Sequence, residues 1–148
     1  MSSSNNAEPT AAEGTPPLPD DDERAIRDLV ALADRSQADA AVLPGLHTDT
    51  TAIVNFYGRR LLGRATFESA MNKALSSGLG AVRTSVEVID IRPLTADAAL
   101  VSCVKTVHDE RPEAEQAPPA TGALTYVTVR TSAGWKIGLA QTTPIASD

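Results

Sequence analysis

The chain has 148 residues, which is enough for one domain with a single hydrophobic core, and its formal net charge is −6. Residues 1–23 hold six of the 19 acidic residues and no Lys or Arg, so the other 13 acidic residues balance the 13 basic ones that follow. A nearly neutral body leaves no basic face for phosphate groups, which excludes nucleic acid as an expected partner. No apolar run approaches membrane-spanning length and no basic start leads into one, so we expect no membrane partner and a cytoplasmic location.

Cysteine and histidine are too sparse to indicate a metal site. Cys103 is the only cysteine, and it alternates with Ala99 and Val101 in a strand-like run, where a lone cysteine most often packs as a small apolar side chain. His47 and His108 have no partners at metal-ligand spacing. The sequence also has no Gly-rich phosphate loop and no dinucleotide-binding fingerprint. We therefore expect neither a metal nor a cofactor.

The N-terminal part divides into a tail and the start of a domain. Residues 1–19 are rich in Ser, Pro, Ala and Glu, a composition that cannot offset the entropy of ordering, so we expect a disordered tail and one domain over residues 20–148. Asp20 is a predicted helix cap, with Glu23 in the capping-box position. The helix that follows has an apolar stripe that requires a sheet to pack on, formed by Ile26, Leu29, Val30 and Ala33.

A hairpin that leads into a helix is predicted in the middle of the chain. A short helix over residues 39–43 is expected first, ended by a Pro-Gly pair. A strand that begins near Thr51 turns at residues 58–60 and returns briefly at 61–62. From about Thr66, apolar residues recur at helical spacing, which predicts a helix that exits near two glycines.

Beyond Gly80 the period of the apolar residues changes to two, which indicates strands. Because no helical pattern intervenes, successive strands are expected to pair in antiparallel fashion. Residues 110–121 contain three prolines and are predicted to form a mobile hairpin loop. The expected strands cover residues 82–91, 98–109, 123–131 and 135–143.

Three motifs, at residues 52–64, 86–94 and 134–144, resemble the nuclear transport factor 2-like superfamily, and in particular its SnoaL-like group of the SgcJ/EcaC type. The resemblance implies an α+β cone in which a strongly curved, mainly antiparallel sheet is wrapped by about three helices around a pocket. It also implies a homodimer joined through the open sheet face. The superfamily includes ketosteroid isomerase and polyketide cyclases, and this group is associated with the biosynthesis of polyketide antibiotics, including enediynes.

Acid and base chemistry in such a pocket requires a base and a hydrogen-bond donor to the developing enolate. The bases that we nominate are His108 and Asp34, each with an ordinary alternative: an exposed strand end for His108 and a solvated helix edge for Asp34. The candidate ligand-binding side chains are Asn55, Tyr57, Tyr126, Trp135 and Gln141.

The ordinary alternatives for these ligand-binding candidates are also structural. Trp135 is expected first as a core residue, and Asn55 first as the partner of a structural hydrogen bond. Gln141 enters the pocket only if the face that it shares with Trp135 looks inward. The basic cluster of Arg59, Arg60 and Arg64 is read first as a solvated turn, with an anionic ligand or a dimer contact as alternatives.

Three functions remain open on the sequence alone. The first is a binding protein or cofactor-independent tailoring factor for a hydrophobic, polyketide-like small molecule. The second is an isomerase or cyclase that transfers a proton in the pocket, with His108 or Asp34 as base and Tyr57 or Tyr126 as donor. The third is a homodimerisation module without a ligand. A buried carboxylate or imidazole at the pocket floor distinguishes the second from the first.

Overall fold

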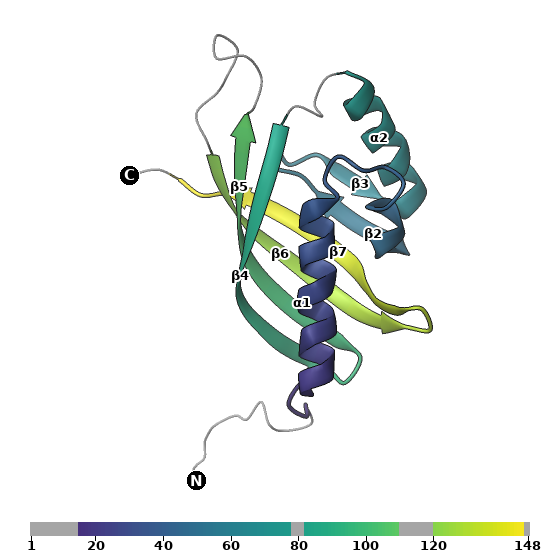
Figure 1. The fold of residues 1–148 in the computed structure, drawn as a ribbon, viewed down its shortest axis with the longest axis vertical. Coiled ribbons are helices and arrows are strands. Elements are labelled where there is room, and N and C mark those ends of the chain that lie inside the picture. The colour runs from purple at the N-terminus through teal and green to yellow at the C-terminus, as the bar shows by residue number, and fades with distance from the viewer. Residues whose placement is uncertain (1–14, 78–81, 110–119, 147–148) are drawn as a thin grey trace.

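The computed structural model describes residues 15–77, 82–109 and 120–146, and it contains helices and strands of the expected α+β class (Figure 1). The residues of the predicted mobile loop lie largely outside the described part, as do most of those of the predicted tail. The elements are α1 (Asp20–Arg35), the 3-10 helix η2 (Pro44–Leu46), β2 (His47–Val54), β3 (Arg60–Leu62), α2 (Arg64–Ser76), β4 (Val82–Thr95), β5 (Ala98–Asp109), β6 (Ala120–Thr131) and β7 (Gly134–Pro144).

The six described strands form one mixed sheet in the order β3-β2-β7-β6-β5-β4. Strands β4 to β7 pair in antiparallel fashion with their neighbours in sequence, as predicted. The hairpin of β2 and β3 is also confirmed, with Ile53 opposite Leu61. Strand β2 lies parallel to β7, the last described strand, so the hairpin joins the sheet through a long-range pairing. This pairing places the β2–β3 hairpin, on which α2 packs, beside the C-terminal strand β7 (Figure 1).

Two α-helices are present in the described part, fewer than the three expected, because residues 39–43 form turns. The side chain of Asp39 accepts a hydrogen bond from the Ala41 N–H at 3.0 Å, and its carbonyl accepts one from the Leu43 N–H at 2.9 Å. An Asp side chain that bonds to the backbone two residues later favours a turn over a helix. Pro44 follows and cannot continue a helix begun before it.

The predicted capping box at the start of α1 is wrong. Pro19 occupies the N-cap position with φ −61° and ψ 151°, and no side chain caps the helix. Glu23 pairs instead with Arg27 at 3.0 Å, one turn along the exposed face. The acidic first turn still lies at the positive end of the helix dipole, where carboxylates are favourable.

The apolar stripe of α1 packs on one face of the sheet, as the sequence predicted (Figure 1). Ile26 is fully buried, and Ala33 nearly so. Cys103 is buried in the same core, where desolvation raises the pKa of its thiol to about 12, so it behaves as the small apolar residue that was expected. The buried core comprises Ile26, Leu29, Val30, Ala33, Leu43, Met71, Ala99, Val101, Cys103, Leu124, Tyr126, Trp135 and Ile137.

A charged cluster attaches the first turn of α1 to the end of the sheet. The guanidinium of Arg130 donates to both carboxylate oxygens of Asp22, at 3.0 and 2.8 Å, and its Nε donates to Asp97 at 2.9 Å. The same guanidinium lies 4.8 Å from the ring centroid of Trp135, whose Nε1 donates to Asp22 at 3.3 Å. The hydrogen bond from Arg130 holds the pKa of Asp22 below its usual value. Trp135 is therefore a structural anchor at this end of the fold.

We expect Ile26→Ala to lower the free energy of unfolding by about 3 kcal/mol, because it removes three methyl or methylene groups from a fully buried site on α1 and leaves a cavity. Chemical denaturation measures this difference. The matched control is Ile89→Ala, since the Ile89 side chain is 59% exposed and its loss should cost far less. Equal losses for the two variants would contradict the packing of α1 on the sheet.

Candidate functional site

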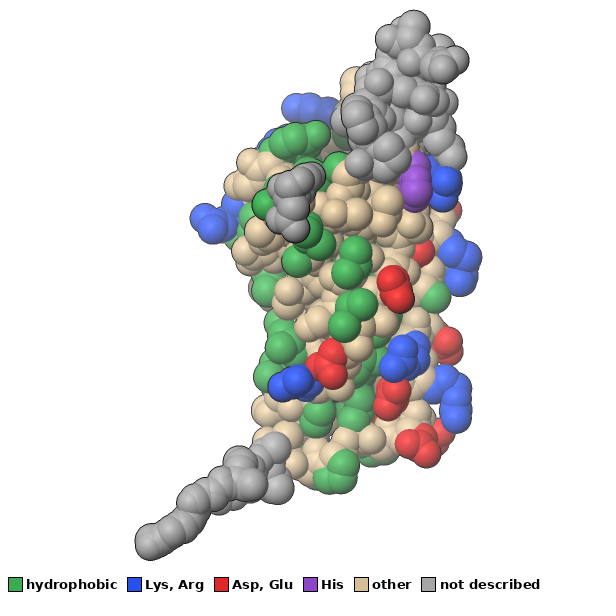
Figure 2. Space-filling view, turned by 90° about the vertical axis from the view of Figure 1, so that its left-hand side faces the viewer, with side chains coloured by type: hydrophobic (Ala, Val, Ile, Leu, Met, Phe, Trp, Pro, Cys, Tyr) green, Lys and Arg blue, Asp and Glu red, His purple; other side chains and the backbone are tan. Residues whose placement is uncertain are grey.

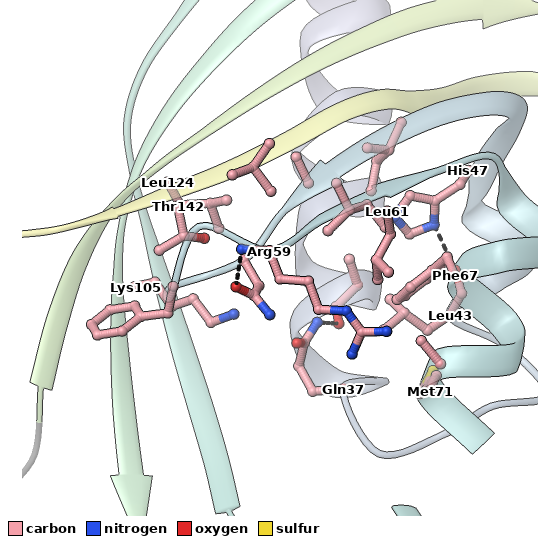
Figure 3. A pocket seen from close by; sticks show the side chains of 18 of the residues that line it. Gln37, Leu43, His47, Arg59, Leu61, Phe67, Met71, Lys105, Leu124 and Thr142 are labelled. Atoms are coloured by element: carbon pink, nitrogen blue, oxygen red, sulfur yellow. Dashed lines mark hydrogen bonds between the residues drawn. The ribbon is translucent and has the colours of Figure 1, made fainter. Parts of the chain in front are cut away.

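A cavity of about 370 Å³ lies between the inner face of the sheet, the C-terminal end of α1, the β2–β3 hairpin and α2 (Figure 3). Most of its wall is apolar. Its described lining residues include no Asp and no Glu. The apolar lining comprises Ala33, Leu43, Ile53, Val54, Phe56, Leu61, Phe67, Ala70, Met71, Ala74, Val86, Leu124, Ile137 and Ala140. The polar lining comprises Gln37, His47, Asn55, Tyr57, Arg59, Lys105, Tyr126 and Thr142.

Lys105 places an ammonium group in this largely apolar cavity (Figure 3). Burial lowers its pKa, and the attraction of Asp34 opposes that shift without outweighing it. Among the described residues, the ammonium has neither a hydrogen-bond partner nor an ion-pair partner. Sequence analysis did not nominate Lys105, although the signal was present: it alternates with Val101 and Cys103, which were expected to face the core.

Tyr126 lies on β6 and lines the cavity with a buried ring. Burial raises the pKa of its phenol, so the hydroxyl keeps its proton and is available as a hydrogen-bond donor. Gln37 lines the cavity one turn beyond Ala33 and is held by a 2.7 Å hydrogen bond from its Nε2 to the Ala33 carbonyl. These two groups supply neutral polar contacts on opposite walls, one from the sheet and one from beyond α1.

Asn55 lines the cavity, but its side chain serves the turn between β2 and β3. Its Oδ1 accepts hydrogen bonds from the backbone N–H groups of Tyr57 and Arg59, at 2.9 and 3.0 Å. Gly58 completes this turn with φ +82°, a conformation that favours glycine. Tyr57 lies at the mouth of the cavity with its side chain 91% exposed. The structural alternative proposed for Asn55 is therefore present, and it fixes the rim of the cavity.

Gln141 does not line the cavity, because strand β7 contains a bulge. Thr128 pairs with Ile137 and Val127 pairs with Leu139, which leaves Gly138 as an extra residue. One extra residue reverses which face each later side chain occupies. Ala140 and Thr142 consequently face the cavity and Gln141 is exposed. Trp135 precedes the bulge and also lies outside the cavity lining, in the cluster with Arg130.

The two nominated bases are not brought together. The Oδ2 of Asp34 accepts a hydrogen bond from the Val86 N–H at 3.2 Å, and its buried Oδ1 has no partner among the described residues. The His108 Nε2 lies 3.3 Å from the Ser85 hydroxyl, on β5 beyond Lys105. Neither side chain lines the cavity. Asp34 is the one that acts on cavity residues electrostatically, since it influences Lys105 and Tyr126.

The arginine cluster separates in the fold. Arg64 forms an ion pair with Asp49 and donates to the His47 carbonyl at 3.2 Å. Arg60 is exposed on β3, whereas Arg59 lines the cavity. Only one member of the cluster is therefore positioned to meet a molecule inside the cavity.

His47 is a further residue of the wall that sequence analysis did not assign to the site. It is buried, its Nδ1 lies 2.9 Å from the Leu43 carbonyl, and its ring centroid lies 4.9 Å from that of Phe67. Burial lowers its pKa. The imidazole is consequently neutral near pH 7 and contributes an aromatic surface rather than a charge.

Comparison with known proteins identifies relatives by family and by fold. The sequence model of the SnoaL-like domain family matches residues 25–141. A domain of unknown function with a cystatin-like fold from Nostoc punctiforme PCC 73102 superposes with a TM-score of 0.76 at 20% identity, over 88% of this chain and 81% of that one. A cystatin-like protein related to nuclear transport factor 2 from Novosphingobium aromaticivorans gives 0.71 at 18% identity, over 86% and 84% of the two chains.

A ketosteroid isomerase-like protein from Erwinia carotovora atroseptica SCRI1043 gives a TM-score of 0.64 at 17% identity, over 85% of this chain and 95% of that one. These likenesses establish the nuclear transport factor 2-like, cystatin-like fold. No curated protein matches the sequence.

No group of three or more His, Cys, Asp or Glu in the described ranges could hold a metal ion. No helix in the described part of the chain is long and apolar enough to cross a membrane.

We expect the stability of the protein to fall as the pH drops from about 7.5 to about 5, in part through His47. Its folded pKa lies below the ordinary value of 6.5, so the unfolded chain takes up the proton first. The stabilisation that the neutral His47 side chain contributes is complete above the ordinary pKa of 6.5. It is lost as the pH falls through the lower pKa of the folded state. Urea denaturation across this range should show a shallower dependence for His47→Gln than for the wild type; identical slopes would contradict the neutral, buried imidazole.

Proposed function

The chain belongs to the SnoaL-like domain family, and we propose that it binds a hydrophobic, polyketide-like small molecule in the cavity between the sheet and α2. The observation that carries the proposal is the cavity itself: about 370 Å³, mostly apolar, with a few polar groups that converge on it. Such a volume accommodates a compact two- or three-ring compound. It favours ligand binding over a module that only dimerises, whose interior would be filled by side chains.

The finer family context extends this proposal. The motifs at residues 52–64, 86–94 and 134–144 resemble the SgcJ/EcaC type, whose members are associated with polyketide and enediyne antibiotics. We therefore propose that the protein acts in antibiotic biosynthesis in the cytoplasm, as a binding protein or cofactor-independent tailoring factor. Gln37, Tyr126 and Thr142 are the neutral polar groups that would orient the ligand's oxygen atoms.

We expect a neutral polycyclic probe, 9,10-anthraquinone, to bind the wild type with a dissociation constant measurable by fluorescence quenching or titration calorimetry. Ala74→Phe should weaken this binding at least about tenfold, because Ala74 lines the cavity from α2 and the added ring occupies it. The matched control is Ala65→Phe, an exposed position on the same helix outside this cavity. Unchanged binding by Ala74→Phe would place the probe elsewhere and contradict the proposal.

A second candidate function is proton transfer by an isomerase or cyclase. The observation that favours it is the buried Asp34 Oδ1, which has no partner among the described residues and lies near Lys105 and Tyr126. In this alternative Asp34 or His108 is the base, and Tyr126 or Tyr57 donates a hydrogen bond to the enolate oxygen. The ketosteroid isomerase-like protein from Erwinia has the same fold, and its name refers to an enzyme that catalyses proton transfer.

Deuterium exchange at the acidic carbon of 2-tetralone, followed by NMR, tests this alternative. Catalysed exchange in the wild type that is lost in Asp34→Asn and kept in His108→Gln would assign Asp34 as the base. The reverse pattern would assign His108. Exchange no faster than in buffer would exclude the alternative for this class of ketone and leave binding alone.

The protein is also proposed to be a homodimer joined through the sheet. The face opposite α1 carries apolar side chains that face neither helix: Leu100, Val127 and Leu139 form a row across β5, β6 and β7, and each is only half-buried. Hydrophobic side chains also reach the surface along the side of the molecule drawn in Figure 2. Uncovered apolar surface of this kind favours association with a second copy.

Light scattering at micromolar concentration should give the mass of a dimer for the wild type, and Val127→Glu should shift it toward that of a monomer. The new carboxylate would be buried without a partner at the centre of the row. The control is Leu62→Glu, at an exposed position on β3, which is an edge strand of the sheet and lies outside the row. A monomeric wild type would contradict this assembly.

A further inference from the structure

The cavity differs in charge from the rest of the molecule. Residues 24–148 hold equal numbers of acidic and basic residues, 13 of each, yet the described lining contains Lys105 and Arg59 and no acidic residue. The remaining titratable wall groups add no negative charge, because burial keeps the imidazole of His47 neutral and the phenol of Tyr126 protonated. The space available to a ligand is therefore bordered only by positive and neutral groups among the described residues.

Lys105 is the cation inside the cavity. Its side chain is half-buried beside the apolar lining, and its ammonium has no hydrogen bond or ion pair with any described residue. Asp34 acts on it through space, but forms no salt bridge with it and directs Oδ2 to the Val86 N–H. A half-buried ammonium is less fully hydrated than one at the surface, so an anion that enters the cavity gains more from it than it would from an exposed lysine.

Arg59 contributes a second cation at the rim. Its backbone belongs to the turn that the Asn55 side chain fixes, and its guanidinium forms no ion pair with any described residue. Figure 3 shows the side chains of Arg59 and Lys105 extending into the same space, one from the hairpin and one from β5. A guanidinium at the mouth of a cavity attracts anions and binds carboxylates in a planar, bidentate manner.

We infer that the ligand is an amphipathic carboxylic acid, bound as the carboxylate by Lys105 with Arg59 at the entrance, while its apolar body lies against Phe67, Met71 and Leu124. The apolar wall limits the polar part to one small anionic group, since further oxygens would find few donors. A carboxylate carries the single charge that the one ammonium inside the cavity can match. This inference rests on the proposed function, because it specifies the chemical class of the molecule in the same cavity.

Two probes of the same shape test the charge preference: 2-naphthoate and its neutral counterpart 2-naphthamide, titrated into the full chain by calorimetry at pH 7 and fixed ionic strength. The wild type should bind the carboxylate at least about tenfold more tightly than the amide. Lys105→Met should remove this preference by weakening naphthoate binding, while naphthamide binding changes less than about twofold. The control is Lys73→Met, at an exposed position on α2, which should keep the wild-type preference.

Each outcome separates the two levels of the proposal. Equal affinity of the wild type for both probes would overturn the carboxylate inference and leave the proposed binding function in place. Failure of both probes and of the anthraquinone to bind would overturn both. A Lys105→Met variant that melts like the wild type but loses both probes would show that the lysine stem only shapes the cavity, which also overturns the inference. If Lys105→Met does not fold, Lys105→Gln replaces it as the variant. The affinity of the wild type for naphthoate relative to naphthamide then decides whether the carboxylate inference holds.

Discussion

The packing of α1 on the inner face of the sheet is the constraint on which the cavity depends. Ile26 and Ala33 pack in the core from α1. The cluster of Asp22, Arg130 and Trp135 attaches the first turn of α1 to the end of the sheet. Burial of apolar area supplies the stabilising free energy, and the charged cluster determines where the helix lies along the strands. The turn that follows the other end of α1 places Gln37 in the cavity lining, where its side chain donates to the Ala33 carbonyl.

The polar character of the cavity follows from which side chains share its walls. Desolvation lowers the pKa of Lys105 and His47 and raises that of Tyr126, so all three shifts have one physical origin, the partial or complete removal of these side chains from water. The three groups differ in consequence. His47 becomes neutral, Tyr126 remains a donor, and Lys105 is the one whose charge is left without a close partner. A bound anion is the partner that we propose for it.

The backbone irregularities decide which residues reach the site. The bulge at Gly138 turns Thr142 inward and Gln141 outward, and the turn at Asn55 directs Arg59 toward the cavity. A bulge inserts one residue into one strand and reverses the alternation beyond it. Counting alternate residues along β7 cannot reveal that Gly138 is the extra residue, because only the pairing with β6 determines the position of the bulge. Lys105 lies on β5, which pairs regularly with β6, so its alternation with Val101 and Cys103 was enough to predict that it faces the interior.

The sequence by itself determined the order and type of the main elements, the apolar stripe of α1, the burial of Cys103 and the family, because these depend on local periodicity and on short motifs. Only the tertiary structure decided the parallel pairing of β2 with β7 and the separation of Asp34, His108 and Trp135 from the cavity lining. The physical reason is that the faces of helices and strands are local properties. Which faces meet around a cavity is set by long-range pairings and by register, which bring together residues far apart in the chain.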